Sequence, residues 1–311
     1  MGGRVQILFI TATRIGDAVL STGLLDHLMR VHPAARFTIA CGPAAAGVFA
    51  RMPRRERTIV LAKRRFRLHW LELWRAVAAQ RWDLVVDLRA SAFAWTVRAG
   101  RRVVARGGRQ AGHRVGQLGA LLGLDPAPLP VAWFAPEDVA RAAGLLPGPG
   151  RWIALGPTAN WDRKVWPAER FVALVRALTA PGGPLPGARV AILGAPGAAE
   201  AALAAPVRAA LGTERAVDLV GRLALPEAAA VLAHAALFVG NDSGLMHLAA
   251  ATGTPTLGLF GPSRVEEYAP AGRRAGFVAA PGSPALDSMA GLEVAPVLAA
   301  AERLLAAPVP A

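Results

Sequence analysis

The sequence predicts an α/β protein with two Rossmann-like domains that face a central cleft. Short apolar runs alternate with helical stretches along the chain, and this alternation is typical of parallel sheets covered by helices. Pro- and Gly-rich segments at 125–130 and 147–150 divide the alternation into two series. The length of 311 residues also fits about two domains. We therefore expect one domain over residues 1–150 and a second over residues 151–311.

Each predicted domain has its own series of strands and helices. In the first, strands are expected at 5–10, 37–41, 58–61, 84–88 and 103–105, with helices at 18–31, 66–79 and 112–122. In the second, strands are expected at 152–155, 190–193, 217–220, 237–239 and 256–260, with helices at 168–178, 198–211, 226–234 and 245–251. A last amphipathic helix at 294–305 could pack back on the first domain.

Composition excludes several classes of protein. A hydrophobic fraction of 54% and a charged fraction of 18% exclude a disordered chain. The single cysteine, Cys41, cannot form an internal disulfide, which fits a reducing compartment. The N-terminal apolar run is too short for a signal peptide, and the sequence at 253–255 interrupts the longest charge-free stretch. We therefore expect a cytoplasmic protein without a membrane span.

Positive charge is concentrated in the first half of the chain. Residues 1–150 contain 22 Lys and Arg against 9 Asp and Glu, whereas residues 151–311 contain 13 against 12. A basic surface of this kind attracts phosphates, nucleic acid or an anionic membrane. No known nucleic-acid-binding module accompanies the charge, so we expect no specific nucleic-acid partner.

The turn after the first predicted strand is the first candidate site. Ligands of open α/β sheets bind at the carboxyl ends of the strands. This turn contains Arg14, Gly16 and Asp17. Gly16 permits close approach of the backbone to a ligand. Asp17 is either a first-turn acid that stabilises its helix or a carboxylate that accepts a proton from a substrate hydroxyl. The residues alone leave both interpretations open.

The turn at 156–167, in the second domain, contains the next candidates. Thr158 and Asn160 offer a hydroxyl and an amide. Lys164 is the only lysine after residue 150 and would be a compact cation for a phosphate. The alternative is that Lys164 is a solvated loop residue.

The turn at 239–244 leads directly into a helix. Gly240 and Gly244 leave the backbone open, and the N–H groups at the start of a helix bind anions. Asp242 and Ser243 can both cap that helix, and His247 shares a helix face with Ser243. The alternative is a capped, buried helix with a core histidine. A further turn at 260–263 would line the same edge of the sheet.

Several well-known sites are missing from the sequence. There is no H-E-x-x-H, no D-x-D and no pair of cysteines, so no metal site is predicted. G-x-G-x-x-G is absent from the first turn, and G-x-S-x-G is absent from the chain. Dinucleotide binding and a serine hydrolase are therefore not supported.

Five segments carry a resemblance to a known family. They read R-I-G-D-A-V-L-S-T (14–22), D-L-V-V-D-L-R (83–89), G-P-T-A-N-W-D-R-K-V-W-P-A-E-R-F (156–171), F-V-G-N-D-S-G-L-M-H-L-A-A-A-T-G-T-P (238–255) and L-F-G-P-S (259–263). Together they resemble the ADP-heptose:lipopolysaccharide heptosyltransferase family, glycosyltransferase family 9, whose fold is GT-B. The resemblance implies inverting transfer of a heptose from ADP-heptose to a lipid-linked saccharide of the lipopolysaccharide core. It implies neither a metal nor another cofactor.

The resemblance also implies roles for individual residues. Asp17 would be the general base on the acceptor hydroxyl, with Arg14 and Gly16 in the acceptor-side loop. The donor nucleotide sugar would be held by Thr158, Asn160, Lys164, Asp242, Ser243, Gly244 and His247. Residues 1–150 would then bind the acceptor and residues 151–311 the donor.

Other functions remain open at this point. A nucleotide-sugar epimerase of similar fold would change the donor without an acceptor. A non-catalytic protein could bind acidic glycolipid or nucleic acid through its basic half. The basic stretch from Arg51 to Arg75 contains Trp70 and Trp74 four residues apart. This stretch is either an interfacial amphipathic helix that docks on an anionic membrane or an ordinary surface helix with both tryptophans in the core. In the first case the protein would be peripheral on the inner face of the inner membrane.

Overall fold

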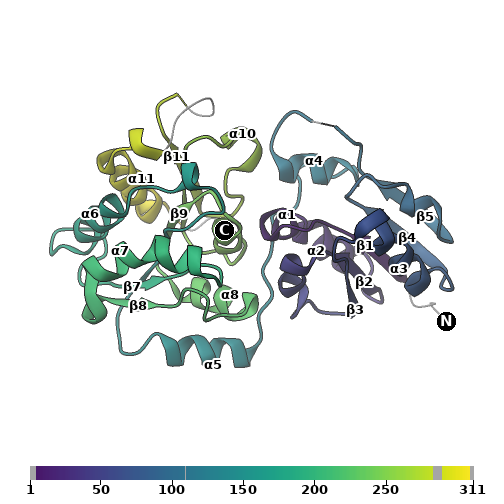
Figure 1. The fold of residues 1–311 in the computed structure, drawn as a ribbon, viewed down its shortest axis with the longest axis horizontal. Helices are drawn as coiled ribbons and strands as arrows, with labels where there is room; N and C mark the ends of the chain where they lie inside the picture. The colour runs from purple at the N-terminus through teal and green to yellow at the C-terminus, as the bar shows by residue number, and fades with distance from the viewer. Residues whose placement is uncertain (1–4, 109, 283–288, 309–311) are drawn as a thin grey trace. The chain divides into compact units, whose positions relative to one another are not determined.

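The computed structural model describes residues 5–108, 110–282 and 289–308. The chain divides into two units, Met1–Trp133 and Phe134–Ala311. Each unit is built around one parallel sheet (Figure 1). The two Rossmann-like units predicted from the sequence are thus confirmed, although the division lies before residue 150.

The first unit contains a five-stranded parallel sheet with the strand order β3-β2-β1-β4-β5. The strands are β1 (Gln6–Ile10), β2 (Arg36–Cys41), β3 (Arg55–Val60), β4 (Trp82–Asp87) and β5 (Ala99–Val104). β1 pairs with β2 on one side and with β4 on the other. Its residues Ile7–Ile10 are fully buried, as expected for the central strand of a sheet covered on both faces.

Helices and 3₁₀ turns connect the strands of the first unit. They are α1 (Ile15–Leu20), α2 (Thr22–Val31), η1 (Pro43–Phe49), η2 (Arg65–Arg67), α3 (Leu68–Val77), η3 (Ala92–Trp95) and α4 (Arg114–Ala120). Leu73 and Val77 of α3 join the core formed with Leu8, Ile10 and Val85 of the sheet.

The helix predicted at 18–31 is interrupted at Ser21. The Ser21 hydroxyl donates to the carbonyl of Ala18 at 2.7 Å, and the Thr22 hydroxyl donates to the carbonyl of Val19 at 2.7 Å. Such hydroxyls compete with backbone N–H groups for helical carbonyls. The result is a short α1 that carries Asp17, followed by a separate α2.

The second unit contains a six-stranded parallel sheet with the order β11-β10-β9-β6-β7-β8. The strands are β6 (Trp152–Gly156), β7 (Arg189–Ile192), β8 (Ala216–Asp218), β9 (Leu237–Asn241), β10 (Thr256–Phe260) and β11 (Ala275–Ala279). β11 was not predicted from the sequence. It lies at the edge of the sheet, where Phe277 is exposed and its other four residues are only partly buried.

The helices of the second unit begin with one that the sequence analysis missed. They are α5 (Pro136–Leu145), η4 (Asp162–Lys164), α6 (Ala168–Thr179), α7 (Ala198–Arg215), α8 (Leu225–His234), α9 (Gly244–Ala251), α10 (Val265–Tyr268), η5 (Met289–Gly291) and α11 (Val294–Ala306). α5 packs against α8, so residues 134–150 belong with the second unit rather than with the first.

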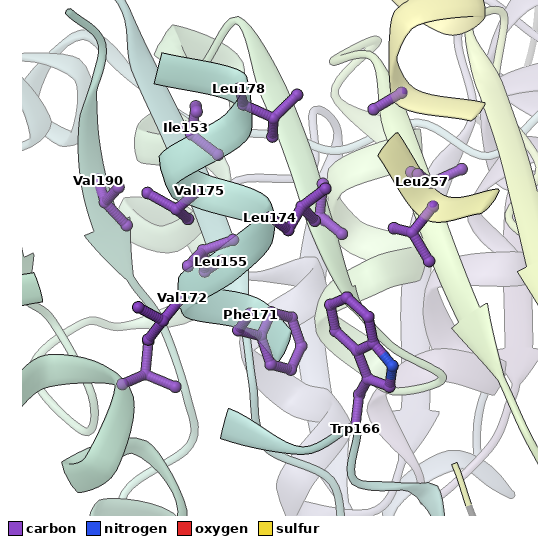
Figure 2. Packing of buried hydrophobic residues seen from close by; sticks show 14 of the residues in the cluster. Ile153, Leu155, Trp166, Phe171, Val172, Leu174, Val175, Leu178, Val190 and Leu257 are labelled. Atoms are coloured by element: carbon purple, nitrogen blue, oxygen red, sulfur yellow. The ribbon is translucent and has the colours of Figure 1, made fainter. Parts of the chain in front are cut away.

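The core of the second unit lies between its sheet and α6, α7 and α11. Phe171, Leu174 and Leu178 of α6 point toward the sheet, where they meet Ile153 and Leu155 (Figure 2). Val297, Ala300 and Ala301 place the buried side of α11 in the same core. The helix predicted at 294–305 is therefore present and packs on its own unit, while its packing on the first unit stays a prediction.

In the described part of the chain, no helix combines the length and the apolar character needed to cross a bilayer.

Candidate active site

Each sheet has one place where the strand order reverses. In the first unit, β1 lies beside β4, and in the second unit, β6 lies beside β9. Ligands of open α/β sheets bind outside the carboxyl ends of the strands at such points. The predicted site residues follow β1, β6 and β9 and therefore lie at the reversal points of their own units.

Two glycines lie side by side near the carboxyl ends of β6 and β9 in the second unit. Gly156 at the end of β6 is in register with Gly240 of β9. A Cβ atom on Gly240 would lie 2.6 Å from the Phe238 ring and 2.8 Å from the Gly156 carbonyl oxygen. A Cβ atom on Gly156 would likewise lie 2.9 Å from the Phe238 ring, so neither position has room for a side chain.

An ion pair joins the two turns that follow these strands. Lys164, the last residue of η4, lies with its Nζ 2.6 Å from Oδ2 of Asp242. The Asp242 side chain is 9% exposed and the Lys164 side chain 23% exposed. An ammonium group has three donors, so Lys164 can hold Asp242 and an anionic ligand together. The structure thus brings together two of the predicted donor-site residues.

The loop that carries Lys164 is anchored at its end by Trp166. The Trp166 backbone N–H donates to Oδ1 of Asn241 at 3.1 Å, and its indole Nε1 donates to the Leu292 carbonyl at 2.7 Å. The indole also packs edge-on against Phe171, with ring centroids 4.9 Å apart. Sequence reasoning missed the role of Trp166 and Asn241, because their partners lie far away along the chain.

The start of α9 supplies backbone donors beside the ion pair. Ser243 precedes the helix and is half-buried, and Gly244 is its first residue. The first N–H groups of a helix have no partner within the helix and favour an anion. His247, one turn further, is 4% exposed, as expected for a residue packed beneath the surface.

Thr158 and Asn160 differ in exposure. Thr158 is 5% exposed, and its hydroxyl lies 3.2 Å from the point where a Cβ on Gly194 would sit. Its side chain is therefore directed toward the end of β7. Asn160 is exposed. Their assignment to the donor site stays a prediction.

In the first unit, Asp17 is the third residue of α1 and is half-buried. This position is in the first turn of the helix, where an acidic side chain interacts favourably with the helix dipole. Arg14 precedes the helix and is exposed, and Gly16 is half-buried. The hydroxyls of Thr11 and Ser21 lie 3.0 Å apart and tie the turn to the far end of α1.

Asp87, the last residue of β4, lies within the segment 83–89, for which the sequence predicted no role of individual residues. It is fully buried and accepts hydrogen bonds from the backbone N–H of Arg89 at 2.8 Å and from the Ser91 hydroxyl. Burial raises the pKa of Asp87, and these hydrogen bonds oppose the rise. The carboxylate shapes the turn after β4, and the Arg89 guanidinium lies over the Trp70 ring, 4.9 Å from its centroid.

Within residues 5–108, 110–282 and 289–308, no group of three or more His, Cys, Asp or Glu side chains has the arrangement needed to hold a metal ion.

A model of a known family matches the chain over most of its length. The model is described as glycosyltransferase family 9 (heptosyltransferase), and it covers residues 48–290. The chain belongs to glycosyltransferase family 9. This finding confirms the family inferred from the motifs, and the matched region contains the turns of Lys164 and Asp242.

Curated relatives carry names from the same family. The chain is 29% identical over 302 residues to "Lipopolysaccharide heptosyltransferase 1" of Pseudomonas aeruginosa, a match that covers 83% of this chain and 79% of that protein. It is 33% identical over 110 residues to "Lipopolysaccharide heptosyltransferase 3" of Escherichia coli, which covers 35% of this chain. The latter match spans 31% of the relative, so the chain matches only about a third of that protein.

Solved structures of the family share the fold of this chain. The structure of "E. coli ADP-heptose lps heptosyltransferase II" has a TM-score of 0.79 at 22% identity and covers 97% of this chain and 98% of its own. The structure of "E. coli heptosyltransferase WaaC with ADP" has a TM-score of 0.74 at 21% identity and covers 96% of this chain and 100% of its own. The predicted two-domain GT-B fold is thereby confirmed.

Proposed function

We propose that this family 9 protein transfers a heptose from ADP-heptose to a lipid-linked saccharide of the lipopolysaccharide core. The observation that carries the proposal is the Lys164–Asp242 ion pair beside the start of α9, within a chain that matches the heptosyltransferase family model. The names of the curated relatives and of the solved relative with ADP support this choice of donor and acceptor.

The proposed reaction is a single displacement that inverts the anomeric carbon. Asp17 accepts the proton of the acceptor hydroxyl, and the hydroxyl oxygen forms a bond to that carbon. The bond between the carbon and the diphosphate oxygen breaks, and ADP leaves with the electron pair. Lys164 and the first N–H groups of α9 stabilise the negative charge that develops on the leaving diphosphate.

In this mechanism the cation and the helix N-terminus do the work that a divalent metal does in other transferases. The proposed enzyme therefore needs no metal, and EDTA should leave its rate unchanged. A loss of activity in EDTA that is restored by Mg²⁺ or Mn²⁺ would contradict this part of the proposal.

The direct test is product analysis with ADP-heptose and a heptose-deficient lipopolysaccharide acceptor. Mass spectrometry should show an acceptor heavier by one heptose and the release of ADP, and NMR of the product should show a new linkage whose anomeric configuration is opposite to that of the donor. The same experiment without acceptor separates the epimerase alternative, because an epimerase converts the donor alone. A non-catalytic glycolipid-binding protein would give neither product.

The proposed acceptor also gives an expected location. A lipid-linked core saccharide that receives sugar from a soluble nucleotide donor is met at the cytoplasmic face of the inner membrane. We therefore propose that the protein is cytoplasmic and associates with that face peripherally, without nucleic acid as a specific partner.

A further inference from the structure

We propose that the outer side of α3, together with η2 and η3, is a docking surface for an anionic lipid bilayer. The inference builds on the proposed lipid-linked acceptor, because it identifies the part of the first unit that meets the membrane. The test uses lipid alone, without donor or acceptor. Membrane docking can therefore fail while the proposed transfer reaction holds, and the transfer reaction can fail while docking holds.

The surface is defined by five large apolar side chains that face solvent. Five of the eleven exposed large apolar residues in the described chain lie between residues 66 and 95, namely Phe66, Leu68, Leu71, Trp74 and Trp95. Phe66 is 78% exposed and Trp95 is 69% exposed, which is unusual for aromatic side chains of this size. We call these five residues the α3 surface.

Large apolar side chains lie on both the buried and the exposed side of α3. His69, Leu73 and Val77 recur every four residues and are buried, and Leu73 and Val77 belong to the core of the first unit. Leu68, Leu71 and Trp74 recur every three residues and are exposed, which places them along the other side of the helix. An ordinary surface helix is polar on the side away from the core. The exposed apolar side chains of α3 therefore indicate an interaction surface.

Trp74 joins α3 to the neighbouring segment of the surface. Its indole Nε1 donates to the Thr96 carbonyl at 3.1 Å, and Thr96 directly follows Trp95 at the end of η3. The two exposed tryptophans thus come from segments that this hydrogen bond holds together. Trp70, by contrast, packs against Phe93 with ring centroids 5.5 Å apart. The tryptophan pair of the sequence is therefore divided, with one ring on the core and one at the surface.

Phe66 has an unusual backbone conformation, and its ring is exposed to solvent. Phe66 has φ 52° and ψ 25°, which is the left-handed region that bulky residues rarely adopt. The guanidinium of Arg65 lies over the Phe66 ring, 4.6 Å from its centroid. A cation stacked on an exposed aromatic ring combines the two chemistries of a lipid interface, where the ring enters the apolar boundary and the cation meets headgroup phosphate.

Basic residues predominate in the part of the chain that carries the α3 surface. Residues 51–106 contain 15 Lys and Arg against four acids, namely Glu56, Glu72, Asp83 and Asp87. Glu72 is already paired with Arg64 at 2.7 Å. Arg57, Arg98 and Arg102 donate to neutral backbone carbonyls rather than to a carboxylate in these contacts.

The charge decides which partner the surface fits. A second copy of this chain would bring equally basic surroundings against the same face, and the like charges would repel. An anionic bilayer offers phosphate for the arginines and an apolar boundary for the five side chains. The partner that matches both features is therefore a membrane rich in acidic phospholipid.

The test is flotation of the purified full chain with vesicles. Wild-type protein should float with phosphatidylcholine vesicles that contain phosphatidylglycerol and should not float with pure phosphatidylcholine. Raising the salt from about 0.1 M to about 0.5 M should weaken binding, because salt screens exposed charges. Equal binding to neutral and anionic vesicles, or no binding to either, would overturn the proposal.

Two variants with matched controls separate the apolar and the charged contributions. Phe66→Ser combined with Leu71→Ser should lower the partition coefficient at least about tenfold. Phe277→Ser, which removes an exposed phenylalanine from the second unit, should leave it unchanged. Arg65→Glu should lower binding at least about tenfold, whereas Arg176→Glu, at an exposed position of α6, makes the same charge change and should have little effect.

ADP binding should be the same in all four proteins, because the changed side chains lie outside the proposed nucleotide site. Thermal unfolding should be unchanged in the variants of Phe66, Leu71, Arg65 and Arg176, whereas Phe277→Ser also loses an edge-on contact with Phe260. If Phe66→Ser with Leu71→Ser binds vesicles like wild type, the α3 surface does not dock on lipid. If light scattering shows a wild-type dimer that this variant abolishes, the surface belongs to a second copy of the chain and the lipid proposal is wrong.

Discussion

Replacing Lys164 by alanine should weaken ADP binding and lower the stability of the second unit. The change removes the cation that lies 2.6 Å from Asp242. The loss has two consequences in the same direction. A charge-assisted contact to the diphosphate disappears, and the Asp242 carboxylate is left without its partner beside the place where the diphosphate would bind.

The magnitude follows from the exposure of the pair. A hydrogen bond to a charged group contributes about 1.5–3 kcal/mol, so the Kd for ADP should rise roughly 10- to 150-fold. Asp242 is 9% exposed and Lys164 23% exposed, which places the pair between a surface and a buried salt bridge. The free energy of unfolding should therefore fall by about 1–2 kcal/mol.

Titration calorimetry with ADP measures the first effect, and urea unfolding measures the second. Arg163→Ala is the matched control, since it removes the neighbouring positive charge, whose guanidinium lies over the Trp161 ring at 5.4 Å. This control should change the Kd by less than about threefold. Unchanged ADP affinity in Lys164→Ala would refute the assignment of Lys164 to the diphosphate.

The double variant Lys164→Ala with Asp242→Asn tests the reason for the loss. If the unpaired carboxylate repels the diphosphate, the double variant should bind ADP more tightly than Lys164→Ala alone. If it binds less tightly, Asp242 contacts the nucleotide directly and repulsion is not its main effect.

Three further outcomes follow from single residues. Asp17→Asn should reduce heptose transfer roughly 10²–10⁴-fold while ADP affinity stays unchanged, because a general base acts on the acceptor only; near-normal turnover in a transfer assay would remove Asp17 from this role. Burial raises the pKa of the Cys41 thiol to about 12, so Ellman's reagent at neutral pH should label it only after unfolding, and rapid labelling of the folded protein would contradict its burial. Burial also raises the pKa of Asp87 above its ordinary value of 3.8, so the folded state holds this proton more tightly than the unfolded state. Stability should therefore fall as the pH rises from 3.8 through the raised pKa, by at most about 1.36 kcal/mol per pH unit. Urea unfolding across this range should show a steeper fall of stability with pH in wild type than in Asp87→Asn, and identical slopes would exclude Asp87 as a source.

Much of the fold could be predicted because parallel strands buried on both faces are continuous apolar runs. β10 begins and ends where the apolar run at 256–260 does. The turns after β1, β6 and β9 could be identified as candidate sites for a related reason. In parallel sheets the ligand-binding residues follow the carboxyl ends of the strands, so glycine and polar residues directly after a predicted strand mark a candidate site.

The elements that were missed depend on contacts that a local pattern does not contain. α5 begins with Pro136 in a segment that resembles a linker, and Asp138 fixes its start by accepting from the Ala135 N–H at 2.8 Å. The break at Ser21 depends on a hydroxyl finding a carbonyl three residues earlier. Neither feature changes the hydrophobic periodicity, so neither could be predicted from it.

The ion pair of the candidate site could not be predicted as a contact, because its residues are 78 positions apart. Sequence alone indicated that each lies in a turn after a strand. The strand order, which sets β6 beside β9, is what brings Lys164 to Asp242.

The indole of Trp166 links the loop that carries Lys164 to the segment that leads into α11. Its hydrogen bond to Leu292 fastens the lysine-bearing loop to the residues that lead into α11. Arg170 adds a second fastening, because it also binds the Leu292 carbonyl and pairs with Glu293 at 2.9 Å. A chain truncated before Leu292 would keep Lys164 and Asp242 but lose both fastenings of the loop that carries Lys164, so this loop would be held less firmly.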